Sequence, residues 1–322
     1  MTEDEKYMYR CLQLAKLGLG KVQPNPMVGA VIVHQNTIIG EGYHHQYGQP
    51  HAEVNAIASV NNKNLLKQST LYVSLEPCSH FGKTPPCADT IIHHGIPKVV
   101  IGTTDPHEKV NGSGIQKLLD AGVQVIQHVC EKECRELNKR FFTYHLLHRP
   151  YIILKWAQTA DGYMDIDRSN PDVIHDYWIT NQALRVVTHK WRSEEDAILV
   201  GYNTVVNDHP QLTTRFYPGK NPKRYVMCRK SENVDLQHYT PLSTDLYAAM
   251  QTLYDQRVQS VIVEGGRKTL DKFIAANLWD EARILTGNQH WNKGTKAPVI
   301  PEQPQLIQQV NDNKIIYVRR HL

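Results

Sequence analysis

The first half of the chain contains His51-Ala52-Glu53, then Pro77-Cys78, and then Cys87, which follows nine residues after Cys78. The spacing of these residues indicates how this half folds. His51 begins a helical pattern, Cys78 follows a strand-like run, and Cys87 begins another helix. An imidazole and two thiolates give a tetrahedral zinc ion three protein ligands and leave a fourth position open for water. An open position is typical of a catalytic zinc, which lowers the pKa of bound water to about 7. Glu53, two residues after His51, is close enough to move protons without binding the metal.

The order His-x-Glu, Pro-Cys and Cys is typical of zinc deaminases. In the alternative interpretation His51 caps a helix and the two cysteines are buried thiols, but four features must then coincide in order. The usual spacing is Cys-x-x-Cys, whereas eight residues separate Cys78 from Cys87. Residues 79–86 therefore form a loop that the metal holds at both ends. The imidazole, amine and hydroxyl groups of this loop favour an anionic substrate such as a sugar phosphate over a bare nucleoside.

Composition and charge exclude several classes of protein. The 322 residues include 36 Lys or Arg and 32 Asp or Glu, so the formal net charge is only +4. Nucleic-acid binding usually requires a clustered basic face, so this margin argues against such a partner. No apolar run approaches the roughly 20 residues of a membrane span, and the acidic start lacks the apolar segment of a signal peptide. Six cysteines are too few for a disulfide scaffold, and we expect a cytoplasmic protein.

Helical and strand-like patterns alternate along the chain, which indicates layered α/β domains. His148-Arg149-Pro150 follows a long helical pattern and precedes a strand, so we expect domains over residues 1–148 and 149–322. In the first we expect helices over residues 7–17, 51–60, 87–94, 115–121 and 131–147, and strands over 30–33, 37–39, 71–75, 98–101 and 123–129. In the second we expect helices near 182–191 and 245–256, and strands over 151–155, 197–200, 224–228 and 260–263. Residues 231–241 and the tail after Trp291 have little pattern.

Three segments resemble the bifunctional riboflavin biosynthesis family RibD: residues 24–29 (PNPMVG), residues 51–53 (HAE) and residues 76–87 (EPCSHFGKTPPC). In that family an N-terminal deaminase precedes an NADPH-dependent reductase. The resemblance, which runs from about residue 5 to about residue 285, implies a cytidine-deaminase-like three-layer domain and a dihydrofolate-reductase-like α/β domain. It also implies Zn²⁺, held by the three ligands above, and NADPH as cofactors.

The resemblance implies substrate contacts in the first domain as well. The residues expected around the pyrimidine and its ribose phosphate are Asn25, His44, His80, Lys83 and Asp105. His44 without the family would be interpreted as a surface histidine. Where relatives often have Asp-Pro-Asn-Pro, this chain has Asp105-Pro106-His107-Glu108.

Residues 155–162, 178–180, 192–215 and 263–266 resemble the reductase half of the family. The resemblance implies cofactor contacts from Ala157, Trp178, Thr204, Asp208 and Gly266, and substrate contacts from Asp176, Arg192, Leu212, Arg215 and Glu264. Arg192 and Arg215 would hold the phosphate through bidentate hydrogen bonds. Asp176 stands where relatives often have Ser, and His209 replaces the second Asp of their Asp-Asp-Pro.

Gly265-Gly266 lies between a strand and a helix, where backbone N–H groups can approach a phosphate at the positive end of the helix dipole. An ordinary turn remains the alternative, and no Gly-x-Gly-x-x-Gly occurs in the second half. Arg267 and Lys268 could meet a 2′-phosphate, which favours NADPH over NADH. Lys155 is a candidate proton donor to the reduced sugar, or else a strand lysine that extends its amine to solvent.

The resemblance implies a two-step enzyme of riboflavin synthesis that deaminates 2,5-diamino-6-(5-phosphoribosylamino)pyrimidin-4-one and then reduces its ribosyl group to ribityl. The product would be 5-amino-6-(5-phosphoribitylamino)uracil. The alternative is a nucleoside or tRNA-type zinc deaminase whose second domain only binds. A zinc-stabilised interaction module without catalysis is a third class, opposed by Glu53 and the open zinc position. We expect a small-molecule substrate, no nucleic-acid or membrane partner, and a homo-oligomer.

Overall fold

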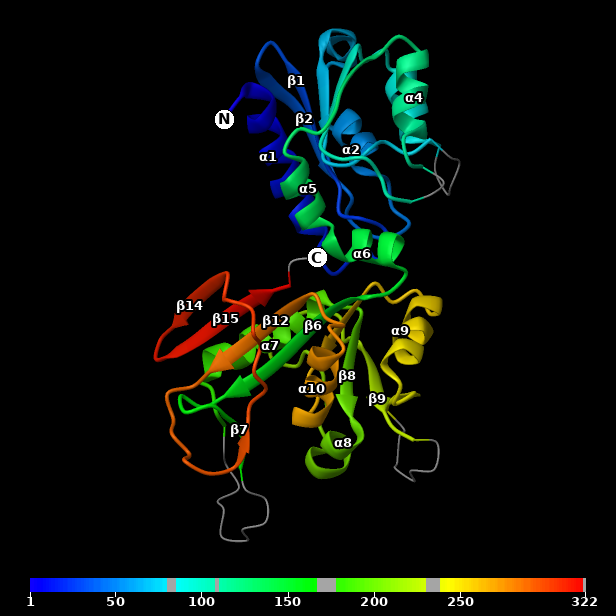
Figure 1. The fold of residues 1–322 in the computed structure, drawn as a ribbon. Coiled ribbons are helices and arrows are strands. Elements are labelled where there is room, and N and C mark those ends of the chain that lie inside the picture. Colours follow the sequence, from blue (N-terminus) through cyan, green and yellow to red (C-terminus); the bar gives the residue numbers. More distant parts are fainter. Residues whose placement is uncertain (80–84, 108–109, 167–177, 230–237, 321–322) are drawn as a thin grey trace. The chain divides into compact units, whose positions relative to one another are not determined.

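The computed structural model describes residues 1–79, 85–107, 110–166, 178–229 and 238–320. The chain divides into two compact units, Met1–Leu147 and His148–Leu322 (Figure 1). Among the described residues, no helix combines the length and the apolar composition that a membrane crossing requires.

The first unit is built on a five-stranded sheet with the order β2-β1-β3-β4-β5. β1 is antiparallel to both of its neighbours, whereas β3, β4 and β5 are parallel. The strands are β1 (Gly29–His34), β2 (Thr37–Tyr43), β3 (Thr70–Val73), β4 (Lys98–Ile101) and β5 (Gln124–Ile126). The helices are α1 (Glu3–Ala15), α2 (Ala52–Ser59), α3 (Cys87–His93), α4 (Ser113–Asp120), α5 (Glu131–Leu137) and α6 (Lys139–Leu147), with short 3₁₀ turns η1 (Lys16–Gly18) and η2 (Lys63–Gln68).

The period-2 alternation of β1 divides the first unit into three layers. Ala30 and Ile32 pack in one cluster with buried residues of α2, α3 and α4. Val31 and Val33 point to the opposite face, where they pack with α1 and with Cys134 of α5. Helices therefore cover both faces of the sheet, and the predicted α/β layers are confirmed.

The second unit is built on an eight-stranded sheet with the order β10-β9-β8-β11-β6-β12-β15-β14. The strands from β10 to β12 are parallel, and β15 and β14 extend the sheet in antiparallel fashion. The strands are β6 (Tyr151–Gln158), β8 (Ala197–Gly201), β9 (Lys223–Met227), β10 (Thr240–Leu242), β11 (Ser260–Val263), β12 (Glu281–Thr286), β14 (Leu306–Val310) and β15 (Asn313–Arg319), and β7 (Tyr163–Asp165) with β13 (Thr295–Lys296) forms a separate two-stranded sheet. The helices are α7 (Gln182–Glu194), α8 (Tyr202–Asp208), α9 (Leu246–Asp255) and α10 (Arg267–Ala275).

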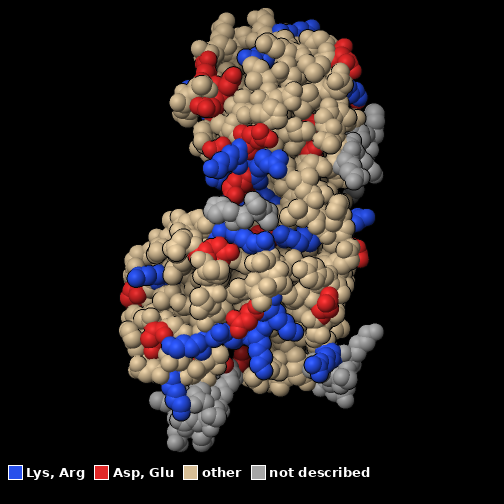
Figure 2. Space-filling model, viewed as in Figure 1, with Lys and Arg blue, Asp and Glu red and all other residues tan. Residues whose placement is uncertain are grey.

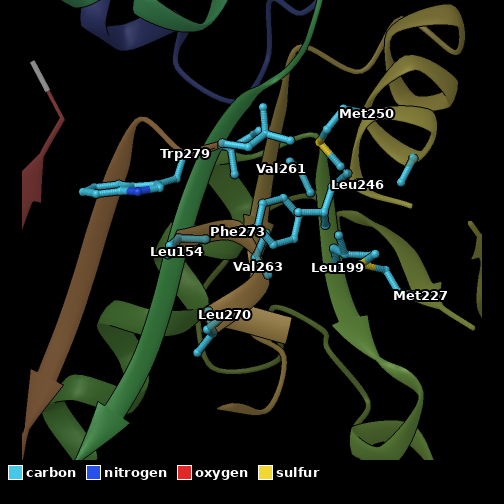
Figure 3. Close-up of a cluster of buried hydrophobic side chains, with 14 of the residues drawn as sticks. Leu154, Leu199, Met227, Leu246, Met250, Val261, Val263, Leu270, Phe273 and Trp279 are labelled. Carbon is cyan, nitrogen blue, oxygen red and sulfur yellow. The ribbon is translucent and has the colours of Figure 1, made fainter. Parts of the chain in front are cut away.

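Both faces of the parallel part of this sheet are buried, as parallel strands require. On one face, Phe273 of α10 and Met250 of α9 pack over Leu154 and Val263 of the central strands (Figure 3). On the other face, Leu184 of α7 packs with buried residues of β6, β8 and β11. The central strands are rigidly held, and residues at their carboxyl ends therefore have fixed positions.

The prediction of a single helix over residues 131–147 is wrong. The helix ends at Leu137 and a new one begins at Lys139. Between them, the buried Asn138 accepts a hydrogen bond from the backbone N–H of Met27 and donates one to the Met27 carbonyl, both at 2.8 Å. These two hydrogen bonds between Asn138 and Met27 fix the loop that carries Asn25. The helical periodicity of residues 131–147 gives no sign of the break that they require.

The tail after Trp291 also differs from expectation, because it contributes three strands. β15 pairs with β12 over residues 281–286 and buries Ile315 and Val318. β14 forms the sheet edge and leaves Leu306 and Ile307 exposed. Because β14 is exposed on both faces, its sequence does not show the alternation of apolar and polar residues on which a strand prediction depends.

Asn138→Ala should lower the free energy of unfolding by about 2–4 kcal/mol, because it leaves the Met27 N–H and carbonyl buried without partners. Urea unfolding followed by circular dichroism measures the change. Asn64→Ala, at an exposed asparagine, is the matched control and should change stability by less than about 0.5 kcal/mol. Equal stabilities of the two variants would contradict the role of Asn138.

Candidate active sites

Three elements of the first unit bring the predicted metal ligands together. His51 is the N-cap of α2, Cys87 is the first residue of α3, and Cys78 follows the carboxyl end of β3. One ligand atom from each residue lies within 4.8 Å of the others. Among the described residues, no other group of three or more His, Cys, Asp or Glu forms such a cluster.

The distances in this cluster fit a tetrahedral zinc ion. His51 Nδ1 lies 3.2 Å from Cys87 Sγ and 3.6 Å from Cys78 Sγ. A tetrahedral zinc with Zn–S of about 2.3 Å and Zn–N of about 2.0 Å places a nitrogen and a sulfur ligand about 3.5 Å apart, close to both of these distances. Hydrogen bonds from Cys87 and His51 hold the pKa of the Cys78 thiol well below its usual value. Since the thiolate is the form that binds metal, the lowered pKa prepares Cys78 to bind zinc, whereas the hydrogen bond with Cys78 and burial raise the pKa of Cys87.

Glu53 lies in the first turn of α2, and its side chain is buried at 3% exposure. Burial raises the pKa of its carboxyl to about 7, against the lowering effect of His51. A carboxyl group beside the ligand cluster, but outside the ligand set, can accept and return a proton.

Asn25 and His44 form a hydrogen-bonded pair next to His51. His44 Nδ1 lies 3.1 Å from the Pro50 carbonyl, so this nitrogen carries the proton in the neutral ring. His44 Nε2 is then the acceptor for the Asn25 amide N–H at 3.1 Å. Burial lowers the pKa of His44, which favours this neutral form. Its ring meets that of His51 edge-on at 5.4 Å. His44 therefore orients Asn25, whose side-chain oxygen can accept a hydrogen bond from a ligand because it has no partner among the described residues.

Glu76 fixes the loop on the other side of the ligands, and the sequence analysis missed it. Its buried carboxylate accepts N–H groups from Asp105, Gly112, Gly114 and Ile115 at 2.9–3.3 Å. Gly114 is required there, because a Cβ would lie 1.9 Å from the Pro77 carbonyl. The position of Glu76 directly before Pro77-Cys78 was the available signal.

Asp105 is 8% exposed and lies where Glu76 holds its backbone. It accepts an N–H from His107 at 2.8 Å, and burial raises the pKa of its carboxyl to about 7. The predicted substrate residues His80 and Lys83 lie outside the described residues, as does Asp176 in the second unit.

The second unit contains a cavity of about 1140 Å³ at the carboxyl ends of its parallel strands. Such a volume exceeds that of an ordinary small-molecule pocket and suits two ligands together. The predicted residues that line it are Lys155, Ala157, Trp178, Arg192, Thr204, Asp208, Leu212, Arg215, Glu264, Gly266, Arg267 and Lys268. The structure thus brings together every described residue predicted for this half.

A buried carboxylate lies in the wall of this cavity. Glu264 accepts from Arg192 Nε at 2.9 Å and Nη2 at 2.7 Å, and Lys155 Nζ lies 3.4 Å away. Arg192 and Lys155 outweigh the effect of burial and hold the pKa of Glu264 at about 2. Burial lowers the pKa of Lys155, while Glu264 opposes that shift. Lys155 is thus no solvent-extended strand lysine.

The strand-to-helix turn after β11 forms another part of the wall. The Gly266 N–H donates to the Thr204 hydroxyl at 3.1 Å, and α10 begins at Arg267. Arg267 is engaged, because it donates to Asp271 at 2.7 Å and to the Lys296 carbonyl at 2.8 Å. Lys268 is exposed. Figure 2 shows Lys and Arg side chains gathered over α10 in this unit.

Helix α7 contributes cavity residues that the sequence analysis missed. Arg185, Thr188 and His189 line the cavity together with Arg192. The spacing of positions 185, 188, 189 and 192 places them on one helix face, and this was the available signal.

Two family models match the chain. The RibD C-terminal domain model covers residues 150–288. The model of the cytidine and deoxycytidylate deaminase zinc-binding region covers residues 1–103.

Curated proteins and solved structures are similar over most of the chain. The riboflavin biosynthesis protein RibD of Aquifex aeolicus (strain VF5) is 40% identical over 90% of this chain and 88% of its own length. The corresponding protein of Synechocystis is 40% identical over 86% of this chain and 70% of its own. The crystal structure of a diaminohydroxyphosphoribosylaminopyrimidine deaminase/5-amino-6-(5-phosphoribosylamino)uracil reductase from Thermotoga maritima is 34% identical, with a TM-score of 0.87 over 98% of both chains.

The purified chain should contain one zinc ion, and Cys78→Ser or Cys87→Ser should lose most of it, because each removes one of three ligands. Elemental analysis by mass spectrometry gives the zinc content per chain. Cys130→Ser, at a half-buried free cysteine outside the cluster, is the control and should retain the metal. Full zinc retention in Cys78→Ser would refute the ligand assignment.

Proposed function

The chain belongs to the RibD family of bifunctional riboflavin biosynthesis deaminase/reductases, and on that basis we propose how its residues carry out the two reactions. The enzyme is both a zinc-dependent hydrolase and an NADPH-dependent oxidoreductase. The alternative of a deaminase with a merely binding second domain is not favoured, because residues 150–288 match the reductase model. We assign deamination to residues 1–148 and reduction to residues 149–322.

The deaminase substrate we propose is 2,5-diamino-6-(5-phosphoribosylamino)pyrimidin-4-one. His51, Cys78 and Cys87 would hold zinc, which when bound activates a water molecule by lowering its pKa. Glu53 would take a proton from the attacking water, and of the two protons that this water gives up, one goes to the adjacent ring nitrogen and one to the departing amine. The water oxygen bonds to the ring carbon, the carbon–nitrogen bond breaks, and ammonia leaves. The observation that carries this assignment is the buried Glu53 carboxyl next to the ligand cluster.

Asn25 and Asp105 are the groups we propose to orient the pyrimidine. The Asn25 amide N–H is held by His44, so its carbonyl oxygen can accept from the ring amines. The raised pKa of Asp105 lets it donate or accept a hydrogen bond near neutral pH. His80 and Lys83, from the long loop between the two cysteines, remain proposed partners of the ribose phosphate.

In the second unit, we propose that the sugar of the deaminated substrate lies against Lys155, Leu212 and Glu264. NADPH, when bound, supplies a hydride to C1′, and the ribosyl group opens to ribityl. Lys155 supplies the proton that the opened sugar requires. The ion pair between Lys155 and Glu264 supports this arrangement, because the Glu264 carboxylate lies 3.4 Å from Lys155 Nζ and holds it in place.

For the dinucleotide we propose the wall formed by Ala157, Trp178, Thr204, Asp208 and Gly266, all of which line the cavity. The turn suits a phosphate, because the backbone N–H groups of Arg267 and Lys268 lie at the start of α10, while the Gly266 N–H is bonded to Thr204. Lys268 is the better candidate for the 2′-phosphate, because Arg267 already binds Asp271.

We further propose a cytoplasmic homo-oligomer that acts on small molecules and binds no nucleic acid. The six free cysteines support a reducing compartment, and the net charge of only +4 argues against a nucleic-acid partner. Light scattering on the purified chain tests its oligomeric state.

Glu53→Gln should reduce ammonia release by roughly 10²–10⁴-fold, because it preserves the shape of the side chain and removes its proton transfer. The variant should retain zinc. It should also oxidise NADPH at the parental rate when given already deaminated substrate, because no reductase residue we propose belongs to the first unit.

The control is Glu133→Gln on the exposed side of α5, which should leave both activities unchanged. Ammonia release within tenfold of the parent would assign the proton transfer to another group. Equal loss of both activities would contradict the separation of the two sites.

Lys268→Gln should lower the preference for NADPH over NADH by about tenfold, because it removes a charged partner of the 2′-phosphate. Arg267→Gln should have a smaller effect, since its guanidinium is already engaged. The ratio of kcat/KM for the two cofactors measures both. An unchanged ratio of kcat/KM for NADPH and NADH in Lys268→Gln would show that the 2′-phosphate binds at another part of the cavity wall.

A further inference from the structure

The arginines of the reductase cavity differ in whether their charge is compensated. Arg192 donates to both oxygens of Glu264, and its Nη1 donates to the Thr213 carbonyl at 3.1 Å. The guanidinium nitrogens of Arg192 are therefore all engaged in hydrogen bonds within the protein. The expectation that Arg192 holds a phosphate through a bidentate pair conflicts with this geometry, since the carboxylate already takes that place.

Arg185, about two turns before Arg192 on the same helix face, is not compensated. Within the part of the chain that the structure describes, its guanidinium has no ion pair and no hydrogen bond, and its Nε is buried without a partner. The guanidinium carbon lies 3.9 Å from the ring centre of Trp178 and 5.6 Å from that of Phe216. Stacking on aromatic rings fixes the plane of the guanidinium but leaves its donors for a ligand.

Arg215 is in a similar state. Its guanidinium lies 5.0 Å from the ring centre of Phe216, and its Nη1 reaches only the Thr213 hydroxyl at 3.4 Å. Among the described residues it has no carboxylate partner. Burial lowers its pKa, and so do the charges of Arg192 and Arg185. Two cations that share the Phe216 ring and repel each other suit an anion that binds both.

His189 does not add a third charge at this place. It is 97% buried, its ring meets Phe216 at 4.9 Å, and its Nδ1 has no partner in the described structure. Burial, together with Arg192 and Arg215, lowers its pKa to about 4. The imidazole is thus neutral at pH 7 and offers hydrogen bonding only.

We propose that Arg185 and Arg215, supported by Phe216, bind the phosphate monoester of the reductase substrate, while Arg192 positions Glu264. A phosphate monoester carries a charge of about −1.5 to −2 at pH 7, which two guanidinium groups match. Bidentate donation from planar forks also suits its oxygens. This inference rests on the proposed function of the second unit and assigns a residue, Arg185, that the family resemblance did not supply.

The test compares the phosphorylated deaminated substrate with its dephosphorylated form in NADPH oxidation by the full-length enzyme. Arg185→Gln should raise KM for the phosphorylated substrate by roughly 10–100-fold, because it removes charge-assisted hydrogen bonds. The KM for the dephosphorylated substrate and for NADPH should stay at parental values. Arg185→Lys, which keeps the charge and loses the planar fork, should lie between the parent and Arg185→Gln.

Lys190→Gln is the matched control, because it removes an exposed cation from the same helix. It should leave all three KM values unchanged, and thermal unfolding confirms that each variant folds. An equal penalty of Arg185→Gln on both substrates would overturn the proposal. A selective rise in KM for NADPH would also overturn it, by assigning the anion to the dinucleotide.

Calorimetric titration with ribose 5-phosphate and with ribose separates this inference from the proposed reductase function. The parent should bind only the phosphorylated sugar, and Arg185→Gln should lose that binding. Such a loss in an enzyme that fails to reduce the deaminated substrate would support the phosphate site and refute the proposed reaction. Equal binding by the parent and Arg185→Gln, in an enzyme that reduces the deaminated substrate, would refute the phosphate site and support the proposed reaction.

Discussion

A buried charge must be paired or hydrogen-bonded, and this requirement organises the candidate sites of both units. In the first unit, Glu76 satisfies its carboxylate with four backbone N–H groups and so fixes the loop that carries Asp105. In the second, Glu264 is satisfied by Arg192 and Lys155 and so fixes two cations at the cavity wall. Residues whose partners lie within the protein hold the site in place. Polar residues that are buried beside a site and have no partner within the protein are available to bind a ligand.

Strand direction explains why these groups meet. In parallel sheets, ligands bind outside the carboxyl ends of the strands. In the first unit β3 leads directly to Glu76 and Cys78, and β4 leads to Asp105. In the second, β6 carries Lys155 and β11 ends just before Glu264. Two unrelated chemistries therefore use the same property of a parallel sheet, and in each case apolar helices on both faces keep the strand ends rigid.

The sequence was sufficient for features that depend on short motifs, and insufficient for those that depend on distant partners. The ligand set His51, Cys78 and Cys87 and the α/β layers followed from spacing and periodicity. The break at Asn138 did not, because its cause is a pair of hydrogen bonds to Met27, 111 residues away. The strands of the tail were missed, because β14 exposes both of its faces. The sequence places Arg192 and Arg185 on one helix face and does not distinguish their roles. Their roles differ because Arg192 pairs with Glu264, which is 72 residues away in the sequence.

The same pairing decides which group of the reductase cavity can give up a proton. Glu264 has a pKa of about 2, because Arg192 and Lys155 outweigh the effect of its burial, so it is ionised near neutral pH and has no proton to donate. The pKa of Lys155 is lowered by burial and by Arg192, and Glu264 only partly restores it. A lowered pKa makes the ammonium a stronger acid while Glu264 keeps it protonated in the ground state. Both pKa values are lowered, which leaves Glu264 ionised and makes the Lys155 ammonium a stronger acid, so Lys155 is the proton donor and Glu264 holds it in position.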